Sequence, residues 1–292
     1  MNAIETQKLT KYYGKHLGIA DVDLQVKEGD FFGFIGPNGA GKSTTIRTLL
    51  GLISPTSGTA GILGQPIGEK QISILSKVGY LPSEASFYAN MKVKDLLSFS
   101  ANLRKKDCTV EAKNLCERLD LDPTRKIREL SLGNRKKIGI ICALQHKPEL
   151  YILDEPTSGL DPLMQKEFYE ILLERNNEGA TIFLSSHILS EISRYCKTAA
   201  VISDGRLLAC DSVEKLGHTG VKRVTLRGIM EDPILPGIRD TVREGDVIRF
   251  LYSGTPHELM EYLAQLRFRD ISITDPDLEE IFLHYYRKEA AQ

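Results

Sequence analysis

One stretch of the sequence combines residue types and spacing suited to holding phosphate. Residues 36–43 read Gly-Pro-Asn-Gly-Ala-Gly-Lys-Ser and fit the pattern G-x-x-x-x-G-K-[ST] at every fixed position. The glycines let the backbone bend and bring its N–H groups close to phosphate oxygens. Lys42 supplies positive charge, and the Ser43 hydroxyl is a ligand for Mg²⁺. We therefore expect a nucleoside triphosphate to be bound by Gly36, Pro37, Asn38, Gly39, Ala40, Gly41, Lys42, Ser43 and Thr44.

Two adjacent carboxylates end an unbroken apolar run. Residues 149–155 read Glu-Leu-Tyr-Ile-Leu-Asp-Glu, which is typical of a central parallel strand buried on both faces. At the carboxyl end of such a strand, Asp154 is suited to hold Mg²⁺ through water, and Glu155 is suited to polarise an attacking water. Burying two acids is costly without a metal or hydrogen-bond donors. The pattern therefore predicts a catalytic pair beside the phosphate loop.

Three further signals are weaker when taken alone. His187 follows the apolar strand at 181–185, within reach of a γ-phosphate, although a lone histidine is more often structural. Ser131 and Gly133 begin a helix and offer a second anion site, although many helices begin in this way. Tyr13 could stack on an adenine ring, but its local sequence favours an ordinary turn tyrosine.

The predicted elements place these residues in an α/β fold. An apolar run at 31–35 leads into the phosphate loop, and Ile46, Leu49 and Leu50 share one face of the helix that follows it. Residues 4–35 are β-rich, and residues 90–146 have the apolar spacing of helices. The other expected elements are strands at 59–66, 77–82, 149–155 and 181–185, a helix at 164–175, and a closing hairpin at 199–209 with an Asp204-Gly205 turn.

Composition excludes several classes of protein. The 292 residues are 41% hydrophobic with a net charge of −1, so no overall charge favours nucleic acid or anionic lipid. No apolar run reaches 18 residues, and the N-terminus does not resemble a signal peptide. Five cysteines without a C-x-x-C pair favour free thiols in a reducing cytoplasm over a zinc site or disulfides. Residues 102–137 hold eleven Lys or Arg against six Asp or Glu, which indicates either a solvated helical face or a surface for anionic groups.

Residues 217–220 resemble a linker, and a small α+β region follows them. This region carries no group of residues suited to chemistry. Its expected elements are strands at 221–226, 246–251 and 269–274, and helices at 256–266 and 278–286.

Taken together, residues 1–217 resemble the ATP-binding subunit of an ABC transporter. The five motifs, in order, are the Walker A loop (36–43), the signature L-S-G-G-Q (130–134), Walker B with the catalytic glutamate (150–155), the D-loop with Asp161 (158–161) and the switch histidine (His187). Leu132 and Asn134 depart from the family signature. Tyr13, in a Tyr-Gly pair, resembles the aromatic residue that stacks on adenine, and the resemblance favours that role over a turn residue.

The resemblance implies a P-loop NTPase (RecA-like) core with an antiparallel β subdomain, a helical subdomain at about 88–146, and a small C-terminal α+β domain at 218–292. In this family two cassettes sandwich two ATP molecules with Mg²⁺, so a second nucleotide-binding domain, identical or different, is expected as partner. Ser131, Gly133 and Asn134 would cap the ATP of that partner. Ser83 stands where the family usually has a Mg²⁺-contacting glutamine, and whether Ser83 or Glu84 replaces it stays open.

The signature departures and the C-terminal segment at 277–282 are most similar to the ABC-2-type branch, whose members power drug, bacteriocin and polysaccharide exporters in bacteria. The resemblance implies a separately encoded permease and a cytoplasmic subunit, peripheral on the inner face of the membrane. A soluble ABC-type ATPase acting on nucleic acid, ribosomes or protein assembly is the alternative, supported only by the basic excess at 102–137, and no nucleic-acid partner is expected. A P-loop kinase or GTPase would leave the signature unexplained.

Overall fold

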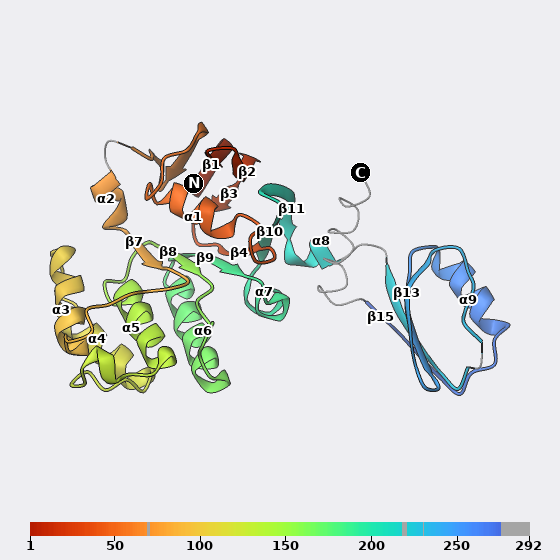
Figure 1. Ribbon diagram of the computed structural model, residues 1–292. Helices are drawn as coiled ribbons and strands as arrows, with labels where there is room; N and C mark the ends of the chain where they lie inside the picture. The colour runs from red at the N-terminus through yellow and green to blue at the C-terminus, as the bar shows by residue number, and fades with distance from the viewer. Residues whose placement is uncertain (69–70, 218–220, 230, 276–292) are drawn as a thin grey trace. The chain divides into compact units, whose positions relative to one another are not determined.

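The structure, a computed structural model, describes residues 1–68, 71–217, 221–229 and 231–275 (Figure 1). The chain divides into two compact units, residues 1–211 and 212–292. Unit 1 and unit 2 each contain a buried hydrophobic cluster, so each unit has a core of its own.

A six-stranded sheet forms the centre of unit 1. Its strand order is β11-β10-β4-β9-β8-β7, and the five strands from β10 to β7 run parallel. The strands are β4 (Phe31–Ile35), β7 (Val78–Leu81), β8 (Leu150–Asp154), β9 (Thr181–Ser186), β10 (Thr198–Ser203) and β11 (Arg206–Ser212). Every residue of β4, β8 and β9 is buried, which confirms the predicted burial of the strands at 149–155 and 181–185. Because carboxyl ends of parallel strands share one edge of the sheet, the segments that follow these three strands meet there.

Unit 1 also contains a second sheet, which is antiparallel. Its strands are β1 (Asn2–Tyr13), β2 (His16–Val22), β3 (Gln25–Lys27), β5 (Ser57–Ile62) and β6 (Gln65–Pro66). The single strand predicted at 59–66 is wrong, because the chain reverses at Leu63 and Gly64, with φ of 50° and 71°. Gly64 suits this turn, but leucine rarely adopts positive φ, so the pair does not match the Asn-Gly or Asp-Gly turns that usually indicate a hairpin.

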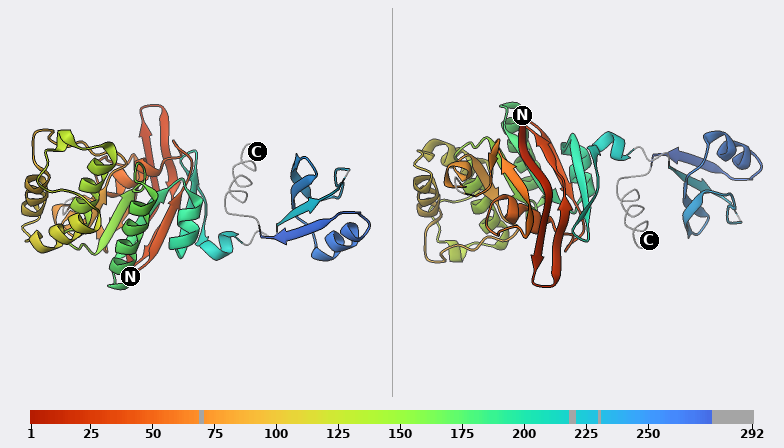
Figure 2. Two further views of the ribbon diagram at one scale, coloured as in Figure 1. Left: turned by 90° about the horizontal axis from the view of Figure 1, so that it is seen from below. Right: turned by 90° about the horizontal axis from the view of Figure 1, so that it is seen from above.

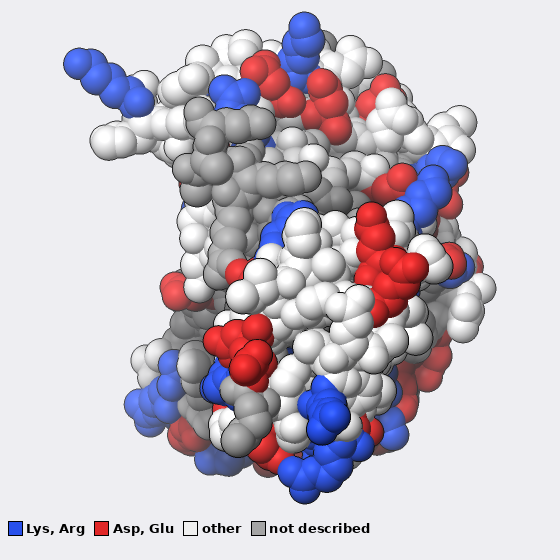
Figure 3. All heavy atoms as spheres, turned by 90° about the vertical axis from the view of Figure 1, so that its right-hand side faces the viewer, with Lys and Arg blue, Asp and Glu red and all other residues white. Residues whose placement is uncertain are grey.

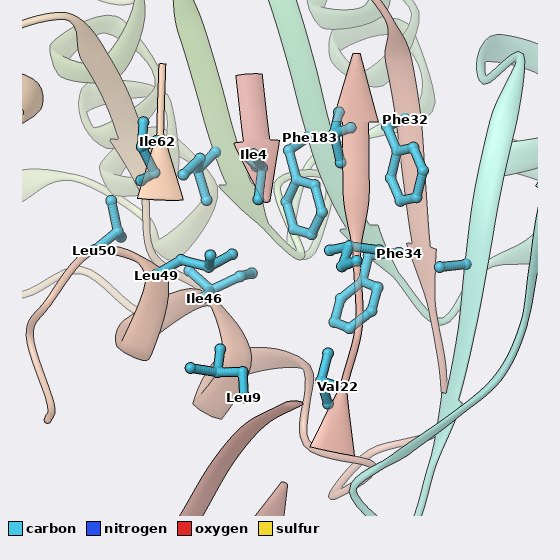
Figure 4. Packing of buried hydrophobic residues seen from close by; sticks show 14 of the residues in the cluster. Ile4, Leu9, Val22, Phe32, Phe34, Ile46, Leu49, Leu50, Ile62 and Phe183 are labelled. Carbon is cyan, nitrogen blue, oxygen red and sulfur yellow. The ribbon is translucent and has the colours of Figure 1, made fainter. Parts of the chain in front are cut away.

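Helix α1 (Lys42–Leu49) connects the phosphate loop to the core between the two sheets. It contacts β2 and β5 of the antiparallel sheet and β8 of the parallel sheet. Ile46, Leu49 and Leu50 are buried in one cluster with side chains from both sheets, which confirms the predicted apolar face (Figure 4). The rings of Phe32 and Phe183 stack in the same cluster, with centroids 5.7 Å apart. Each such side chain contributes about 1.5–3 kcal/mol on burial, so α1 and its N-terminus are firmly anchored.

The predicted helical character of residues 90–146 is confirmed. Helices α3 and α4 lie together at one end of unit 1, beyond β7, and α5 packs against both of them and against β7 (Figures 1 and 2). The helical elements of unit 1 are α2 (Gln71–Leu75), α3 (Val93–Leu103), α4 (Thr109–Arg118), a 3-10 turn (Ile127–Glu129), α5 (Leu132–Leu144), α6 (Pro162–Asn177) and α7 (Leu189–Tyr195). Among helices in the described ranges, none has the length and apolar character needed to cross a bilayer.

The predicted hairpin at the end of the parallel sheet is also confirmed. β10 and β11 are neighbours, and Asp204 and Gly205 join them with φ of 44° and 77°. Positive φ at both central residues is the geometry that an Asp-Gly pair favours in a two-residue hairpin turn.

The described part of unit 2 is an antiparallel sheet with two helices. The strand order is β13-β14-β12-β15, and the elements are α8 (Val213–Gly217), β12 (Lys222–Arg227), β13 (Ile238–Glu244), β14 (Val247–Tyr252), α9 (Pro256–Ala264) and β15 (Asp270–Thr274). β13 was not predicted, because this edge strand is exposed at nearly every residue and lacks an alternating pattern. The helix predicted at 278–286 and most of the linker predicted at 217–220 lie outside the described residues.

Acidic and basic side chains are mixed on unit 2. Ion pairs join Arg243 to Asp232 and Arg269 to Asp246, with shortest N–O distances of 2.7 Å in both. The face presented in Figure 3 likewise carries both signs in small groups. On the described residues of this face, the mixture of both signs is typical of a solvated surface.

Candidate functional site

The phosphate loop connects β4 to α1 at the carboxyl edge of the parallel sheet. Residues 37–39 are exposed at its tip, whereas Gly36 is buried at its base. A side chain at Gly36 would collide with the backbone oxygen of Ile202, and Gly41 has φ of 106° in the left-handed region. Limited space therefore requires glycine at position 36, and the backbone conformation favours glycine at position 41. An exposed turn leading into a helix N-terminus is a suitable site for an anion.

The Lys42 side chain folds back over the loop and is almost fully buried. Its Nζ donates to the backbone oxygen of Gly36 at 2.6 Å and of Pro37 at 3.1 Å. The same atom lies 3.2 Å from Oε1 of Glu155. The ammonium is thus held by carbonyl and carboxylate oxygens at the place where the loop would receive phosphate oxygens.

Asp154 joins the phosphate loop to two strands. The residue is 1% exposed, and its two carboxylate oxygens accept from Oγ of Ser43 at 2.7 Å and from Oγ of Ser185 at 2.6 Å. These two donors compensate the burial of a charged group. Ser185 was not predicted as a site residue. Its only signal is the register of the sheet, in which Asp154 of β8 pairs with Ser185 of β9.

Glu155 adopts a backbone conformation that is rare outside glycine, with φ of 48°. Its N–H donates to the backbone oxygen of Ser185 at 3.1 Å. Its Oε2 lies 2.7 Å from Nδ1 of His187, and its Oε1, which pairs with Lys42, is buried without a hydrogen-bond partner among the described residues. The carboxylate therefore lies between an ammonium and an imidazole and keeps lone pairs that can accept from a water molecule.

The signature and D-loop segments contact each other within one chain. Ser131 is the N-cap of α5, and its Oγ accepts from the backbone N–H of Asn134 at 3.3 Å. A Cβ on Gly133 would lie 2.8 Å from the backbone oxygen of Gly159, so only glycine fits there. Ser131 is exposed, which leaves the start of α5 accessible from outside the subunit.

Asp161 has a structural role that the sequence interpretation missed. Its Oδ1 accepts from the backbone N–H of Leu163 at 3.1 Å and of Met164 at 3.0 Å, which makes it the N-cap of α6. The signal was present, because Asp followed by Pro is a typical start of a helix.

Tyr13 lies beside the phosphate loop. Its side chain is 46% exposed at the end of β1. A Cβ on Gly18 would lie 2.9 Å from Cε2 of Tyr13 and 3.1 Å from Cγ2 of Thr44, so both side chains crowd the same glycine. An exposed ring next to Thr44 is well placed for a ligand that is held by the loop.

Comparisons with known proteins agree with this geometry. A family model described as ABC transporter matches residues 19–158. The chain is 33% identical to an ABC transporter ATP-binding protein of Synechocystis sp., over 98% of this chain and 85% of that protein. It is 30% identical to the linearmycin resistance ATP-binding protein of Bacillus subtilis, over 96% of this chain and 97% of that protein. It is 41% identical to the bacitracin transport ATP-binding protein of Bacillus licheniformis, over 70% of this chain and 68% of that protein. A solved ATP-binding subunit of an ABC transporter superposes with a TM-score of 0.69 at 30% identity, over 73% of this chain and 91% of that one.

The chain belongs to the ATP-binding subunits of ABC transporters. It is an ABC transporter ATPase, and the family resemblance inferred from the five ordered motifs is confirmed. The expected fold class is confirmed as well, with a P-loop core, an antiparallel β subdomain, helices α3 to α5 and a C-terminal sheet.

The segment that replaces the family glutamine in this ABC ATPase does not reach the Ser43–Asp154 pair by a hydrogen bond in the described structure. Glu84 is exposed, and Ser83 is half-buried. No group of three or more His, Cys, Asp or Glu suited to a metal occurs among the described residues. The Ser83 or Glu84 assignment to Mg²⁺ therefore stays a prediction.

Lys136 is a second residue near the site that sequence interpretation missed. Its Nζ donates to the backbone oxygens of Ser83 at 2.9 Å and Glu155 at 3.0 Å. Burial lowers the pKa of this ammonium, and the negative charges of Asp154, Glu155 and Glu84 oppose that shift.

The basic excess at 102–137 is partly internal to the fold. Lys136 and Lys137 are buried, and Arg118 pairs with Glu167 and Glu174 of α6. These three cations are therefore not available to a nucleic-acid backbone, which weakens the main support for the alternative of a nucleic-acid ATPase.

Proposed function

We propose that this subunit hydrolyses ATP to power a bacterial ABC-2-type exporter, through ATP-driven dimerisation of nucleotide-binding domains. The observation that carries the proposal is the Glu155 carboxylate, held between Lys42 and His187 at the edge of the sheet that carries the phosphate loop. The relatives that are named for bacitracin transport and linearmycin resistance support export of drug-like compounds.

The same geometry suggests how hydrolysis proceeds. ATP phosphates lie on residues 36–44, and Lys42 turns from Glu155 to the β- and γ-phosphates, where its charge offsets the charge that develops in the transition state. Glu155, released from Lys42, orients the attacking water and accepts its proton. His187 holds the other carboxylate oxygen and contacts the γ-phosphate. Tyr13 stacks on the adenine ring.

The oxygen donors beside the loop fit Mg²⁺. The Ser43 hydroxyl and the Asp154 carboxylate are hard ligands of the kind that this ion prefers, and they already lie 2.7 Å apart. Ser43 would bind the ion directly and Asp154 through water. When bound, Mg²⁺ supplies positive charge that offsets the charge of the phosphate oxygens.

Partners and organisation complete the proposal. The accessible start of α5 supports capping of the ATP of a second nucleotide-binding domain by Ser131, Gly133 and Asn134, with Asp161 in the adjoining D-loop. Residues 1–217 form the ATPase domain and 218–292 an accessory domain. The subunit works in the cytoplasm, on the inner face of the membrane, with a separately encoded permease. Co-purification of that permease from membranes tests this part.

The variant Glu155→Gln tests the catalytic assignment. Removing the base lowers turnover by about 10²–10⁴-fold, because general-base catalysis contributes about that much. ATP binding persists, and an ATP-bound dimer accumulates in size-exclusion chromatography. Glu149→Gln is the matched control, since Glu149 precedes the same strand at its amino end and forms an exposed ion pair with Lys77. Wild-type turnover in E155Q would refute the assignment.

A further inference from the structure

Lys136 is a buried cation whose contacts the proposed reaction does not use. It lies in the second turn of α5 and is 8% exposed. Its Nζ donates to three backbone oxygens, those of Ser83 at 2.9 Å, Glu155 at 3.0 Å and Pro82 at 3.4 Å. An ammonium has three N–H donors, so these three carbonyls compensate its burial. No side-chain carboxylate pairs with it within 4 Å in the described structure.

The three carbonyls come from two segments with separate tasks. Pro82 and Ser83 follow β7, at the point where the sequence has serine in place of the family glutamine. Glu155 follows β8 and carries the proposed base. Lys136 itself belongs to the helix that begins with the signature. One nitrogen atom therefore joins the turn after β7, the peptide of the base and the signature helix.

The contact with Glu155 bears directly on the direction of its carboxylate. Glu155 has φ of 48°, a conformation that persists only when the surroundings hold it. Ser185 fixes the N–H of this residue, and Lys136 fixes its carbonyl. Rotation of either peptide would carry the carboxylate away from Lys42 and His187.

We propose that Lys136 is a positioning residue that holds the Glu155 peptide in its left-handed conformation and ties it to the Pro82–Ser83 turn. This inference rests on the proposed role of Glu155. Movement of α5 or of that turn is thereby transmitted to the carboxylate through a single ammonium. The tie runs through backbone oxygens, so it does not depend on which side chain occupies position 83.

The test compares Lys136→Met with Lys137→Met in the full chain. Lys137 is the neighbouring residue on α5 and is 6% exposed, but its Nζ contacts only the backbone oxygen of Asp120, at 3.4 Å, in the described structure. We expect kcat to fall about 10- to 100-fold in K136M, since small misplacements of a catalytic group cost that much, with KM for ATP within about twofold of wild type. K137M keeps both constants near wild type. Wild-type kcat in K136M, or an equal loss in K137M, would overturn the inference.

Two further variants keep the test decisive if K136M does not fold. Lys136→Arg retains donors and is expected to restore most of kcat, whereas Lys136→Gln, with a shorter stem, loses kcat and keeps KM. Hydrogen exchange gives a readout independent of turnover. Residues 80–85 and 153–157 should exchange faster in K136Q, while 31–35 of the same sheet keep wild-type protection. A uniform increase indicates a general structural role and overturns the inference.

The outcome for E155Q separates this inference from the proposed function. Wild-type turnover in E155Q refutes the role of Glu155 and the inference that depends on it. An inactive E155Q combined with a fully active K136M and K136Q refutes only the role of Lys136.

Discussion

Replacing Ser185 with alanine tests how the acidic pair is held. Ser185 is fully buried, and its Oγ donates to Asp154 Oδ1 at 2.6 Å and accepts from the backbone N–H of Glu155 at 3.3 Å. The substitution removes one oxygen atom and leaves a buried carboxylate oxygen without its donor. The backbone bond between Ser185 and Glu155 remains, so the strand pairing itself is kept.

Loss of this hydrogen bond should change both the free energy of unfolding and the Mg²⁺ requirement of the ATPase. A hydrogen bond to a buried charged group is worth about 1.5–3 kcal/mol, so the free energy of unfolding should fall by that amount. For a domain of about 200 residues this lowers Tm by about 3–12 °C. Because the residues that orient a metal ligand typically contribute about 10- to 100-fold to metal affinity, the Mg²⁺ concentration for half-maximal ATPase activity should rise by about that factor.

Ser186→Ala is the matched control on the same strand. Ser186 is equally buried. Its Oγ also donates to a carboxylate, that of Glu191 on α7 at 2.8 Å, and accepts from the backbone N–H of Ile188 at 2.9 Å. Thermal unfolding and Mg²⁺ titration of ATPase activity are measured on both variants. We expect similar losses of Tm, with a shifted Mg²⁺ requirement only in S185A. An unchanged requirement in S185A, or an equal shift in S186A, refutes the reasoning.

Two further predictions concern Lys42 and His146. Lys42→Ala should weaken ATP binding about 10- to 100-fold in calorimetry, because a charge-assisted bond to phosphate is lost, and unchanged affinity contradicts the role of the loop. Burial lowers the pKa of His146 from 6.5 to about 4. As the pH falls, His146 therefore binds a proton in the unfolded chain before it does so in the folded chain. The free energy of unfolding is highest above about pH 6.5 and falls by up to about 3 kcal/mol as the pH approaches 4. Urea unfolding of the wild type should show a lower free energy of unfolding at pH 5 than at pH 7, and His146→Gln should make this difference smaller. An identical difference in the wild type and the variant contradicts the prediction.

The residues that the sequence predicts as a group are those that sit next to strand ends. Lys42, Asp154, Glu155 and His187 each follow a short apolar run or a glycine loop, and parallel strands bring their carboxyl ends to one edge. The local sequence pattern and a general rule of sheet topology were therefore enough to predict that these side chains lie close together. The apolar face of α1 was equally local, since its spacing alone identifies it.

Ser185 and Lys136, which the sequence interpretation missed, depend on contacts between distant segments. Ser185 matters because β9 lies beside β8 in one register, and register between strands separated by a helix leaves no local mark. Lys136 appears in a run of basic residues that is typical of a solvated face, yet its nitrogen reaches the turn after β7. The positive φ of Glu155 is held by tertiary contacts against its own preference.

The ion pair between Lys42 and Glu155 also bears on which anions the loop accepts. The carboxylate is a competitor tethered inside the site, 3.2 Å from the ammonium, and tethering of this kind corresponds to an effective concentration of about millimolar or above. A ligand must displace it to gain Lys42. A triphosphate places several charges on the loop and so gains more on displacing the carboxylate than a monovalent anion does. The ion pair thus favours multiply charged ligands over singly charged ones, and in the proposed reaction the same carboxylate, once displaced, would act on water.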